Sequence, residues 1–399
     1  MRLEPALRER SILLVLLGVQ FTHLMDFMVL MPLGPQFMRI WHISTTQFAV
    51  LVSAYTLSAA VTSLLWSLYV DRFDRKRALL FIYCGFAVST VVCAAAPDFA
   101  WLLAARAVSG AFGGIAAAAV YSIVGDVVPD ARRGTAMGIV MTAFPISAVA
   151  GVPLGLTLAN AFDWRAPFIF LAIVSSIVLI AALSLLPKMD AHVAQARLRH
   201  PFQQALAVLS DHNHLRALTL TAVMIFGGFS VIPFIAPYMV GNVGLSETDL
   251  PWLYFFGGIA TFFTSRLWGR MSDRHGKQQM FTIISCISII PLLACTNLPP
   301  VPLWVAILVM VTFMVFVSGR FVPAMAIVTG AAQPDLRGAF LSFNSAIQQL
   351  GSSAASLASG FLIARGASGA LTGYWKSGLV AVCCAFAAIW LARKVRIVN

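Results

Sequence analysis

Charged residues are scarce in this chain, and acidic residues are scarcer than basic ones. Of its 399 residues, 11% are charged and 60% are hydrophobic, and 15 Asp and Glu stand against 27 Lys and Arg. A water-soluble domain could not cover so much apolar surface with so few polar side chains. The composition therefore excludes an ordinary soluble protein and predicts a chain whose surroundings are largely lipid.

Signatures of catalysis and cofactor binding are also missing from the sequence. There is no Walker sequence, no nucleophile clustered with a base and no metal-ligand spacing. All six cysteines fall within apolar stretches, where cysteine usually serves as a small buried hydrophobe. We therefore expect no enzymatic activity, no metal and no other cofactor.

Glycosylation acceptors and soluble domains are absent as well. No Asn-X-Ser/Thr sequence occurs, the predicted outer connections are short, and no segment could form a sizeable receptor domain. These absences fit a bacterial inner membrane better than a eukaryotic cell surface. The basic N-terminus resembles a signal region, but the apolar run from Ser11 to Met38 is too long for a cleaved core and is expected to be the first span.

What the chain does contain is a succession of long apolar segments. A helix needs about 20 mostly apolar residues to cross a bilayer, and such segments recur from Ser11 to Ala392. We therefore predict an all-α membrane protein with twelve transmembrane helices. The predicted spans are 11–38, 46–70, 78–96, 99–125, 135–161, 166–187, 215–241, 249–270, 279–296, 301–328, 339–364 and 373–392.

Basic residues indicate how these spans are oriented. Most of the 27 Lys and Arg gather in alternate connections, which is the positive-inside pattern of membrane proteins and not a nucleic-acid-binding face. Both termini are therefore predicted to be cytoplasmic. The opposite side carries only Arg39, Arg165, Arg365 and Lys376, and three arginines lie within spans: Arg106, Arg266 and Arg320.

An internal duplication divides the chain into two six-helix halves. An offset of 202 aligns Asp71 with Asp273, Arg72 with Arg274, Cys84 with Cys286, Cys93 with Cys295, Pro97 with Pro299 and Pro35 with Pro237. Because six is an even number, both halves start on the same side of the membrane and are parallel repeats. We predict an N-terminal six-helix bundle over 1–187, a cytoplasmic linker over 188–214 and a C-terminal six-helix bundle over 215–399. The linker is expected to hold a short amphipathic helix at 201–209 on the membrane surface.

Two connections at equivalent places carry an acid followed by a basic turn. The first contains Asp71, Arg72, Arg75 and Arg77, and the second contains Asp273, Arg274 and Gly276. Both resemble the cytoplasmic loop signature of the major facilitator superfamily, although the first has Ser67 and Asp74 at its glycine positions. The resemblance implies that family's fold and a gating role for the two acids, which could pair with a neighbouring helix end in one conformation only. Anchoring by positive charge would explain the basic residues but not the two matched acids.

Two further segments resemble motifs of the same superfamily. Arg106 begins a run with downstream glycines that is similar to the second motif, and a guanidinium within a span costs several kcal/mol unless it faces protein or water. We therefore expect Arg106 to point inward, with snorkelling to the outer interface as the alternative. Gly151, Pro153 and Gly155 resemble the third motif, typical of antiporters, in a form nearer to the arabinose-efflux-permease-like branch. Close helix packing alone would also explain these residues.

One acid lies near the middle of a predicted span. Asp26 is about 15 residues into the first span, about 20 Å deep at the helical rise of about 1.5 Å per residue, and an intramembrane carboxylate is by default a functional-site hypothesis. His23 lies one turn earlier on the same face, so the two side chains could bind and release a proton. Proton antiporters of the superfamily often carry an acid at a similar place, which implies a coupling role for Asp26. A permanently hydrogen-bonded structural Asp26 is the alternative.

A substrate cavity is expected between the halves. Arg320 lies about 15 Å deep at the helical rise of about 1.5 Å per residue, and it needs a carboxylate, a cavity or an anionic ligand to offset its charge. We expect Asp26 and Arg320 to line this cavity from opposite halves, unless Arg320 only braces neighbouring carbonyl groups. The other candidate cavity residues are Asn344, Gln348, Gln20, Tyr55, Phe226 and Phe229, although amides within spans also serve as contacts between helices.

These features favour a secondary active transporter that exports a small molecule by proton antiport, with alternating access to the two sides of the membrane. A proton-coupled symporter or facilitator that imports a metabolite is the first alternative, and a membrane receptor without transport is the second. Drugs, sugars, nucleosides and siderophore-like metabolites all fit as substrates. The expected partners are the substrate, protons and the lipid bilayer, without nucleic acid, and we expect a monomer.

Overall fold

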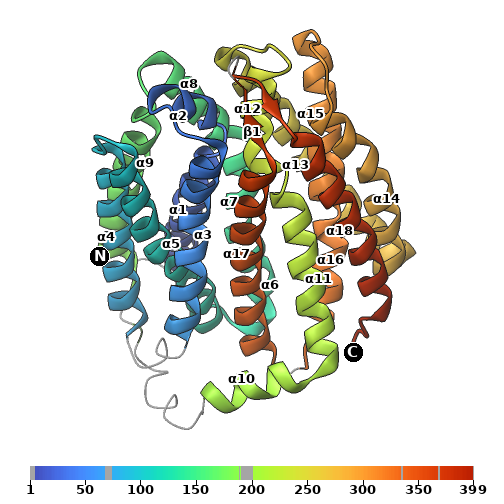
Figure 1. The fold of residues 1–399 in the computed structure, drawn as a ribbon. Coiled ribbons are helices and arrows are strands. Elements are labelled where there is room, and N and C mark those ends of the chain that lie inside the picture. The colour runs from blue at the N-terminus through green and yellow to red at the C-terminus, as the bar shows by residue number, and fades with distance from the viewer. Residues whose placement is uncertain are drawn as a thin grey trace.

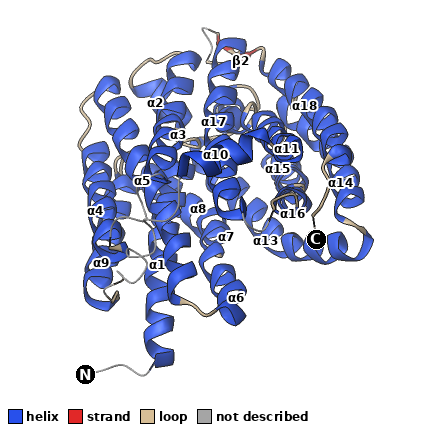
Figure 2. Cartoon of the chain, turned by 90° about the horizontal axis from the view of Figure 1, so that it is seen from below, coloured by secondary structure: helices blue, strands red, loops and turns tan. Residues whose placement is uncertain are grey.

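The computed structural model describes residues 5–67, 74–187, 189, 201–333, 336–366 and 369–398. These residues are almost entirely helical and form two bundles that stand side by side (Figure 1, Figure 2). One short helix, α10 (Pro201–Ser210), lies across one end of the molecule, which we call the α10 end. The predicted all-α fold is thereby confirmed, and the short helix expected at 201–209 is present.

The N-terminal bundle runs from α1 to α9. Its elements are α1 (Pro5–Val29), α2 (Gly34–Ile40), α3 (Thr45–Ser67), α4 (Arg75–Ala94), α5 (Phe99–Val127), α6 (Asp130–Met141), α7 (Ala143–Ile146), the π-helix η2 (Ser147–Gly151), α8 (Val152–Ala161) and α9 (Ala166–Leu185).

The C-terminal bundle runs from α11 to α18. Its elements are α11 (His212–Phe229), the 3₁₀ turn η4 (Ile232–Phe234), α12 (Ile235–Gly241), the 3₁₀ turn η5 (Glu247–Asp249), α13 (Leu250–His275), α14 (Lys277–Thr296), α15 (Leu303–Gly319), α16 (Phe321–Gly330), α17 (Arg337–Leu362), β1 (Ala364–Arg365), β2 (Leu371–Thr372) and α18 (Tyr374–Lys394). Helix α11 begins at His212, so it reaches into the predicted linker 188–214.

Ten segments among the described residues are long and apolar enough to cross a membrane. The predicted count was twelve, and the two predicted spans outside this group correspond to α13 and α17, which are 26 residues long but more polar. Part of this polarity is buried, because Ser353 and Ser356 of α17 face the protein interior and not lipid. A helix that lines the junction between two bundles does not need an apolar surface all round.

Proline interrupts the helices of several predicted spans. The span 11–38 is split between Val29 and Gly34, and the span 215–241 is split at the equivalent place, between Phe229 and Ile235. The span 301–328 is split at Arg320, three residues before Pro323. Proline lacks a backbone N–H group and clashes with the preceding turn, so the helix bends or breaks there.

A short β-ribbon that was not predicted follows the span predicted at 339–364. Helix α17 ends at Leu362, and a two-stranded antiparallel ribbon follows, in which Ala364 pairs with Thr372 and Arg365 pairs with Leu371. The ribbon is the one sheet in the described part of the chain. The ribbon forms the connection between α17 and α18.

Among the described residues, one of the three apolar clusters joins the two bundles. One cluster contains residues of both halves, including Phe48 of α3 and Phe234 of η4, whose rings lie 5.8 Å apart. The other two clusters each belong to a single half, around Phe86 in the N-terminal bundle and Phe281 in the C-terminal bundle. The bundles are therefore fused at the end that holds α2 and α12, which we call the α2 end (Figure 1).

Polar contacts between the bundles gather at the same end. Arg39 forms an ion pair with Glu247, whose backbone carbonyl also accepts a 3.0 Å hydrogen bond from Asn160. Arg365 donates to the carbonyl oxygen of Met38 over 2.8 Å, and Thr46 donates to the carbonyl oxygen of Gly360 over 2.9 Å. These contacts close the α2 end of the molecule.

Candidate functional site

The buried ion pair between α1 and α5 is the centre of the candidate site. Arg106 Nη1 donates to Asp26 Oδ2 over 2.7 Å, and Ser109 Oγ donates to the same oxygen over 3.1 Å. Both charged side chains are 0% exposed. Arg106 thus lies inside the bundle, as the cost of a lipid-facing guanidinium predicts, and Asp26 has found its opposite charge within its own half.

His23 and Tyr55 extend this pair into a short polar chain. The Tyr55 hydroxyl and His23 Nδ1 are 2.7 Å apart, and both side chains are buried. The Arg106 guanidinium lies over the Tyr55 ring, 4.4 Å from its centroid, within the range of a cation–π contact. His23 and Asp26 were expected to act as a pair, and the structure connects them through Tyr55 and Arg106.

Glycines of the second motif bring the three helices together. A Cβ atom at Gly110 would lie 2.2 Å from the carbonyl oxygen of Tyr55, and one at Gly113 would lie 2.4 Å from the Tyr55 hydroxyl. A side chain at either position would push α5 away from α3. The motif therefore supplies both the cation and the close helix contact that holds Tyr55 against it.

Arg320 lies in the C-terminal bundle without such a partner. Its side chain is 2% exposed, and its Nε and Nη2 atoms have no hydrogen-bond partner in the described part of the chain. Asp26 and Arg320 were expected to line one cavity from opposite halves. The structure instead holds Asp26 in contact with Arg106, and Arg320 lies beside Gly228, where an added Cβ atom would be 3.7 Å from Nη2.

The two halves meet at residues that are equivalent in the duplication. Phe27 of α1 and Phe229 of α11 are separated by 202 positions, the offset of the repeat. Their rings lie 5.9 Å apart, tilted by 35°. Asp26 and Gly228 precede these two phenylalanines and are equivalent in the same way, so both flank the junction between the bundles.

The other predicted cavity residues take different places. Asn344 is buried and accepts a 2.7 Å hydrogen bond from Thr221, so it connects α17 to α11. Gln20 donates to the Tyr121 hydroxyl over 3.0 Å within the N-terminal bundle. Gln348 and Phe226 are half-buried. Phe229 thus lies at the junction, and the Tyr55 ring lies 5.8 Å from that of Phe27. Asn344 is a contact between two helices of one bundle.

The third motif packs directly on the helix that carries Asp26. A Cβ atom at Gly151 would lie 3.2 Å from the Met25 side chain, and one at Gly155 would lie 2.6 Å from Val29. The π-helix η2 ends at Gly151, and Pro153 follows in the first turn of α8. These residues therefore let α8 approach α1 on both sides of Asp26.

The two connections that resemble the superfamily's loop signature differ at positions 74 and 276, where only the second has glycine. Gly276 has a φ of +93°, a conformation that residues with a side chain rarely adopt, whereas Asp74 has a φ of −57°. Asp74 instead caps α4 by accepting from the backbone N–H of Arg77 over 2.8 Å. Asp71 and Arg72 lie outside the described residues. Arg75 is buried, and Arg77, Asp273 and Arg274 are exposed.

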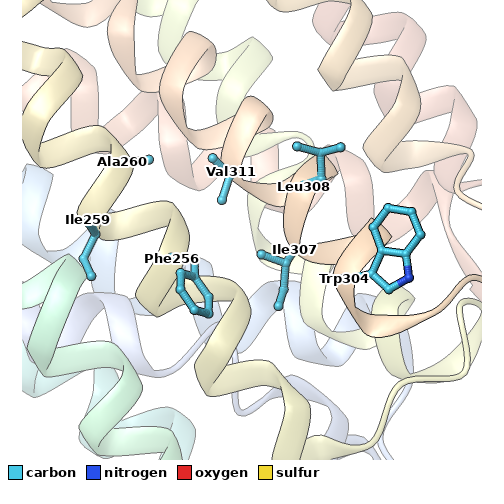
Figure 3. A pocket seen from close by; sticks show the side chains of 7 residues that line it. All are labelled: Phe256, Ile259, Ala260, Trp304, Ile307, Leu308 and Val311. Carbon is cyan, nitrogen blue, oxygen red and sulfur yellow. The ribbon is translucent and has the colours of Figure 1, made fainter.

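The apolar groove between α13 and α15 is a poor candidate site. Figure 3 shows its lining, which is Phe256, Ile259, Ala260, Trp304, Ile307, Leu308 and Val311. Trp304 is 69% exposed and Leu308 is 56% exposed. In a membrane protein such an exposed apolar surface faces lipid, so the groove lies on the flank of the bundle and not at the junction.

Comparison with known proteins decides the family. A family model described as Major Facilitator Superfamily matches residues 16–227 and 217–397. The chain belongs to the major facilitator superfamily. It is a multi-pass membrane transporter of small molecules, and no catalytic family is indicated.

Relatives within the superfamily resemble the chain over most of its length. The uncharacterized MFS-type transporter YceJ of Bacillus subtilis (strain 168) is 25% identical over 349 residues, which cover 86% of this chain and 87% of YceJ. The uncharacterized MFS-type transporter YbcL of the same organism is 22% identical over 305 residues, which cover 75% of each chain.

Solved structures of the superfamily have the same fold. A bacterial homologue of the human lysosomal transporter Spinster, in an inward-facing and occupied conformation, superposes with a TM-score of 0.80 over 99% of this chain and 97% of its own, at 16% identity. A D-xylose-proton symporter superposes with a TM-score of 0.75 over 95% of this chain and 96% of its own, also at 16% identity. At this level of identity the likeness concerns the fold alone.

Proposed function

We propose that this transporter exports a small molecule in exchange for protons, with Asp26 as the proton-coupling group. The observation that carries the proposal is the fully buried Asp26–Arg106 ion pair. Its charges are buried between membrane-spanning helices, where an ion pair gives little stability compared with apolar packing. A chain that keeps such a pair beside the junction of two bundles has a functional reason to do so.

Protonation of Asp26 would change the net charge of this buried site. The ionised carboxylate offsets the charge of Arg106 through the 2.7 Å contact. When a proton binds, Arg106 becomes an uncompensated buried cation, which costs several kcal/mol. This cost favours a different arrangement of α1 against α5. The hydrogen-bonded side chains of His23 and Tyr55 are the polar groups that would carry the proton to and from Asp26.

The conformational cycle follows from the contacts between the bundles. The α10 end is the cytoplasmic one in this proposal, with both termini on that side and the chain in a bacterial inner membrane. The closed α2 end then corresponds to a state that is shut toward the outside. The resemblance of Gly151, Pro153 and Gly155 to the motif typical of antiporters supports exchange over symport. Their packing against α1 is equally compatible with both.

Reconstituted proteoliposomes test the proposal and separate it from its alternatives. A panel of labelled drugs, sugars, nucleosides and organic acids is first screened for uptake, with a pH-sensitive dye in the lumen. Antiport raises the luminal pH when substrate enters, symport lowers it, and a facilitator leaves it unchanged. A receptor gives no uptake of any compound.

The variant Asp26→Asn identifies the coupling group. It is expected to keep exchange of labelled for unlabelled substrate, which demonstrates a folded protein, and to lose the luminal pH change. Asp163→Asn is the matched control, because Asp163 is a surface acid paired with Arg165 within one bundle. Normal proton exchange by Asp26→Asn would refute the assignment.

A further inference from the structure

The guanidinium of Arg320 is a buried charge without a counter-charge in the described part of the chain. Its Nε and Nη2 atoms are enclosed and make no hydrogen bond, and no described carboxylate forms an ion pair with it. The bracing of neighbouring carbonyl groups that was considered from the sequence is not observed for these two atoms. An isolated cation at this depth costs several kcal/mol. A negatively charged group bound beside Arg320 would offset this cost.

The duplication shows which residue stands in the place of Asp26 in the other half. In the N-terminal half, Asp26 supplies the counter-charge of Arg106 through Nη1, although Nε and Nη2 of Arg106 also lack a hydrogen-bond partner among the described residues. The equivalent residue in the C-terminal half is Gly228, and a Cβ atom built there would lie 3.7 Å from Arg320 Nη2 and 3.8 Å from Ile232, with no closer atom. Arg320 is not the repeat equivalent of Arg106, which corresponds to Leu308 at the offset of 202. The C-terminal half therefore has a cation of its own beside the position where the N-terminal half has Asp26, and a small side chain at that position would lie at ordinary contact distance from it.

Local structure holds Arg320 in this place. It stands at the break between α15 and α16, and Pro323 prevents the helix from continuing straight. Broken helices near the middle of a span are a common feature of substrate sites in transporters. Close contact between Gly227 and Cys384 of α18 keeps α11 tight against its own bundle, with Gly228 beside the guanidinium.

We propose that Arg320 binds the carboxylate of the transported molecule, so that the substrates are organic carboxylate anions. The bound carboxylate takes the place that Asp26 occupies in the other half. Phe27 and Phe229 lie at the junction next to Asp26 and Gly228, and they supply an apolar wall for the body of such a molecule. This inference rests on the proposed transport function and adds the chemical class of the substrate.

Binding to the purified protein in detergent tests the proposal without any proton gradient. The probes are benzoate and its neutral isostere benzamide, compared at constant pH and ionic strength by the shift of the thermal unfolding midpoint. Benzoate is expected to stabilise the protein and benzamide is not. In Arg320→Met the benzoate affinity should fall by about 10- to 100-fold, the loss expected for a buried charge-assisted hydrogen bond, and Arg320→Lys should retain part of it.

Two results would overturn the proposal: no stabilisation by benzoate, or an equal effect of benzoate and benzamide. Binding in detergent moves no proton across a membrane, so this test is separate from that of the coupling mechanism. The control variant Asp163→Asn, at a surface acid outside the site, should bind benzoate as the wild type does. Failure of proton coupling therefore leaves the benzoate result intact, and failure of benzoate binding leaves the coupling result intact.

An internal carboxylate provides a second test that needs no ligand. Gly228→Asp places an acid beside Arg320, and Gly228→Asn is its uncharged match with a similar helix propensity. The Asp variant should unfold at a higher temperature than the Asn variant, and it should no longer bind benzoate. In the Arg320→Met background the difference between Asp and Asn should vanish or reverse. Equal stabilities of the two variants in the presence of Arg320 would contradict the proposal.

Discussion

Arg106 and Arg320 are two buried arginines whose roles differ because of the residue opposite each of them. Arg106 meets Asp26 at 2.7 Å, whereas Arg320 meets Gly228. In the function proposed above, a proton bound by Asp26 controls the first cation, and the second accepts a negative charge from the substrate. One pair of equivalent positions, Asp26 and Gly228, would then separate the proton site from the substrate site.

Removal of Arg106 should destabilise the fold as well as stop transport. Arg106→Gln leaves Asp26 as an unpaired buried carboxylate, and breaking a buried pair from one side costs about 3–5 kcal/mol. We expect a lower unfolding midpoint in denaturant and no proton exchange.

The double variant Asp26→Asn/Arg106→Gln is the control for this prediction. It removes both charges, so its loss of stability should be smaller than the sum of the two single losses. Additive losses would show that the two residues do not interact in the folded protein.

At the scale of elements, close contacts between helices depend on a few positions without a side chain. Helix α5 offers a matched comparison, because Gly110 would place a Cβ atom 2.2 Å from a backbone oxygen of α3, whereas Gly125 has nothing within 4 Å. Gly110→Ala should therefore separate α5 from α3 and cost about 1–3 kcal/mol. Gly125→Ala should be neutral or stabilise by about 0.4–1 kcal/mol.

Thermal unfolding and substrate exchange measured on the two variants decide this prediction. Transport should fall in Gly110→Ala because Tyr55 no longer lies against Arg106 and His23. Equal behaviour of the two variants would mean that the α3–α5 contact adjusts without consequence.

The start of α11 carries a cap whose strength depends on pH. Asp211 accepts hydrogen bonds from the backbone N–H groups of His214 and Asn213 over 3.0 Å and 2.7 Å. The His214 bond is the main cause that lowers the pKa of Asp211 below its ordinary value of 3.8. A group with a lowered pKa in the folded state stabilises above the unfolded pKa, and the contribution is lost as pH falls through the folded one.

Asp211→Ala should therefore cost about 1 kcal/mol at neutral pH, the usual loss of an N-cap. The difference from wild type should shrink as the pH falls below about 4. Asp211→Asn keeps the capping oxygen and should stay near wild-type stability without this pH dependence. Thermal unfolding between pH 7 and pH 3 measures both, and a pH-independent difference for Asp211→Ala would contradict the assignment.

At the scale of the whole molecule, the repeat made the architecture predictable from the sequence. The 202-residue offset predicted two equivalent bundles, and it also aligns the breaks after α1 and α11. The partner of Asp26 was not predictable in the same way, because the sequence does not show which of the two inward-facing arginines, Arg106 or Arg320, packs against the first span. The glycines at 110 and 113 decide the question, since they bring α5 against α3 and thereby turn Arg106 toward α1.

The contacts that close the α2 end lead to a prediction about the equilibrium between the state closed at this end and the state open at this end. Glu247 connects the bundles through Arg39, which is well exposed. An exposed ion pair contributes about 0.2–1 kcal/mol, so Glu247→Gln should shift the population toward the state open at the α2 end by about 1.4- to 5-fold. Hydrogen–deuterium exchange of the backbone at 45–48 and 360–363 should rise accordingly. Asp163→Asn breaks an ion pair at the same end but within one bundle, so it should leave this exchange unchanged. An equal increase in both variants would mean that general loosening of the surface, and not release of the contact between bundles, causes the effect.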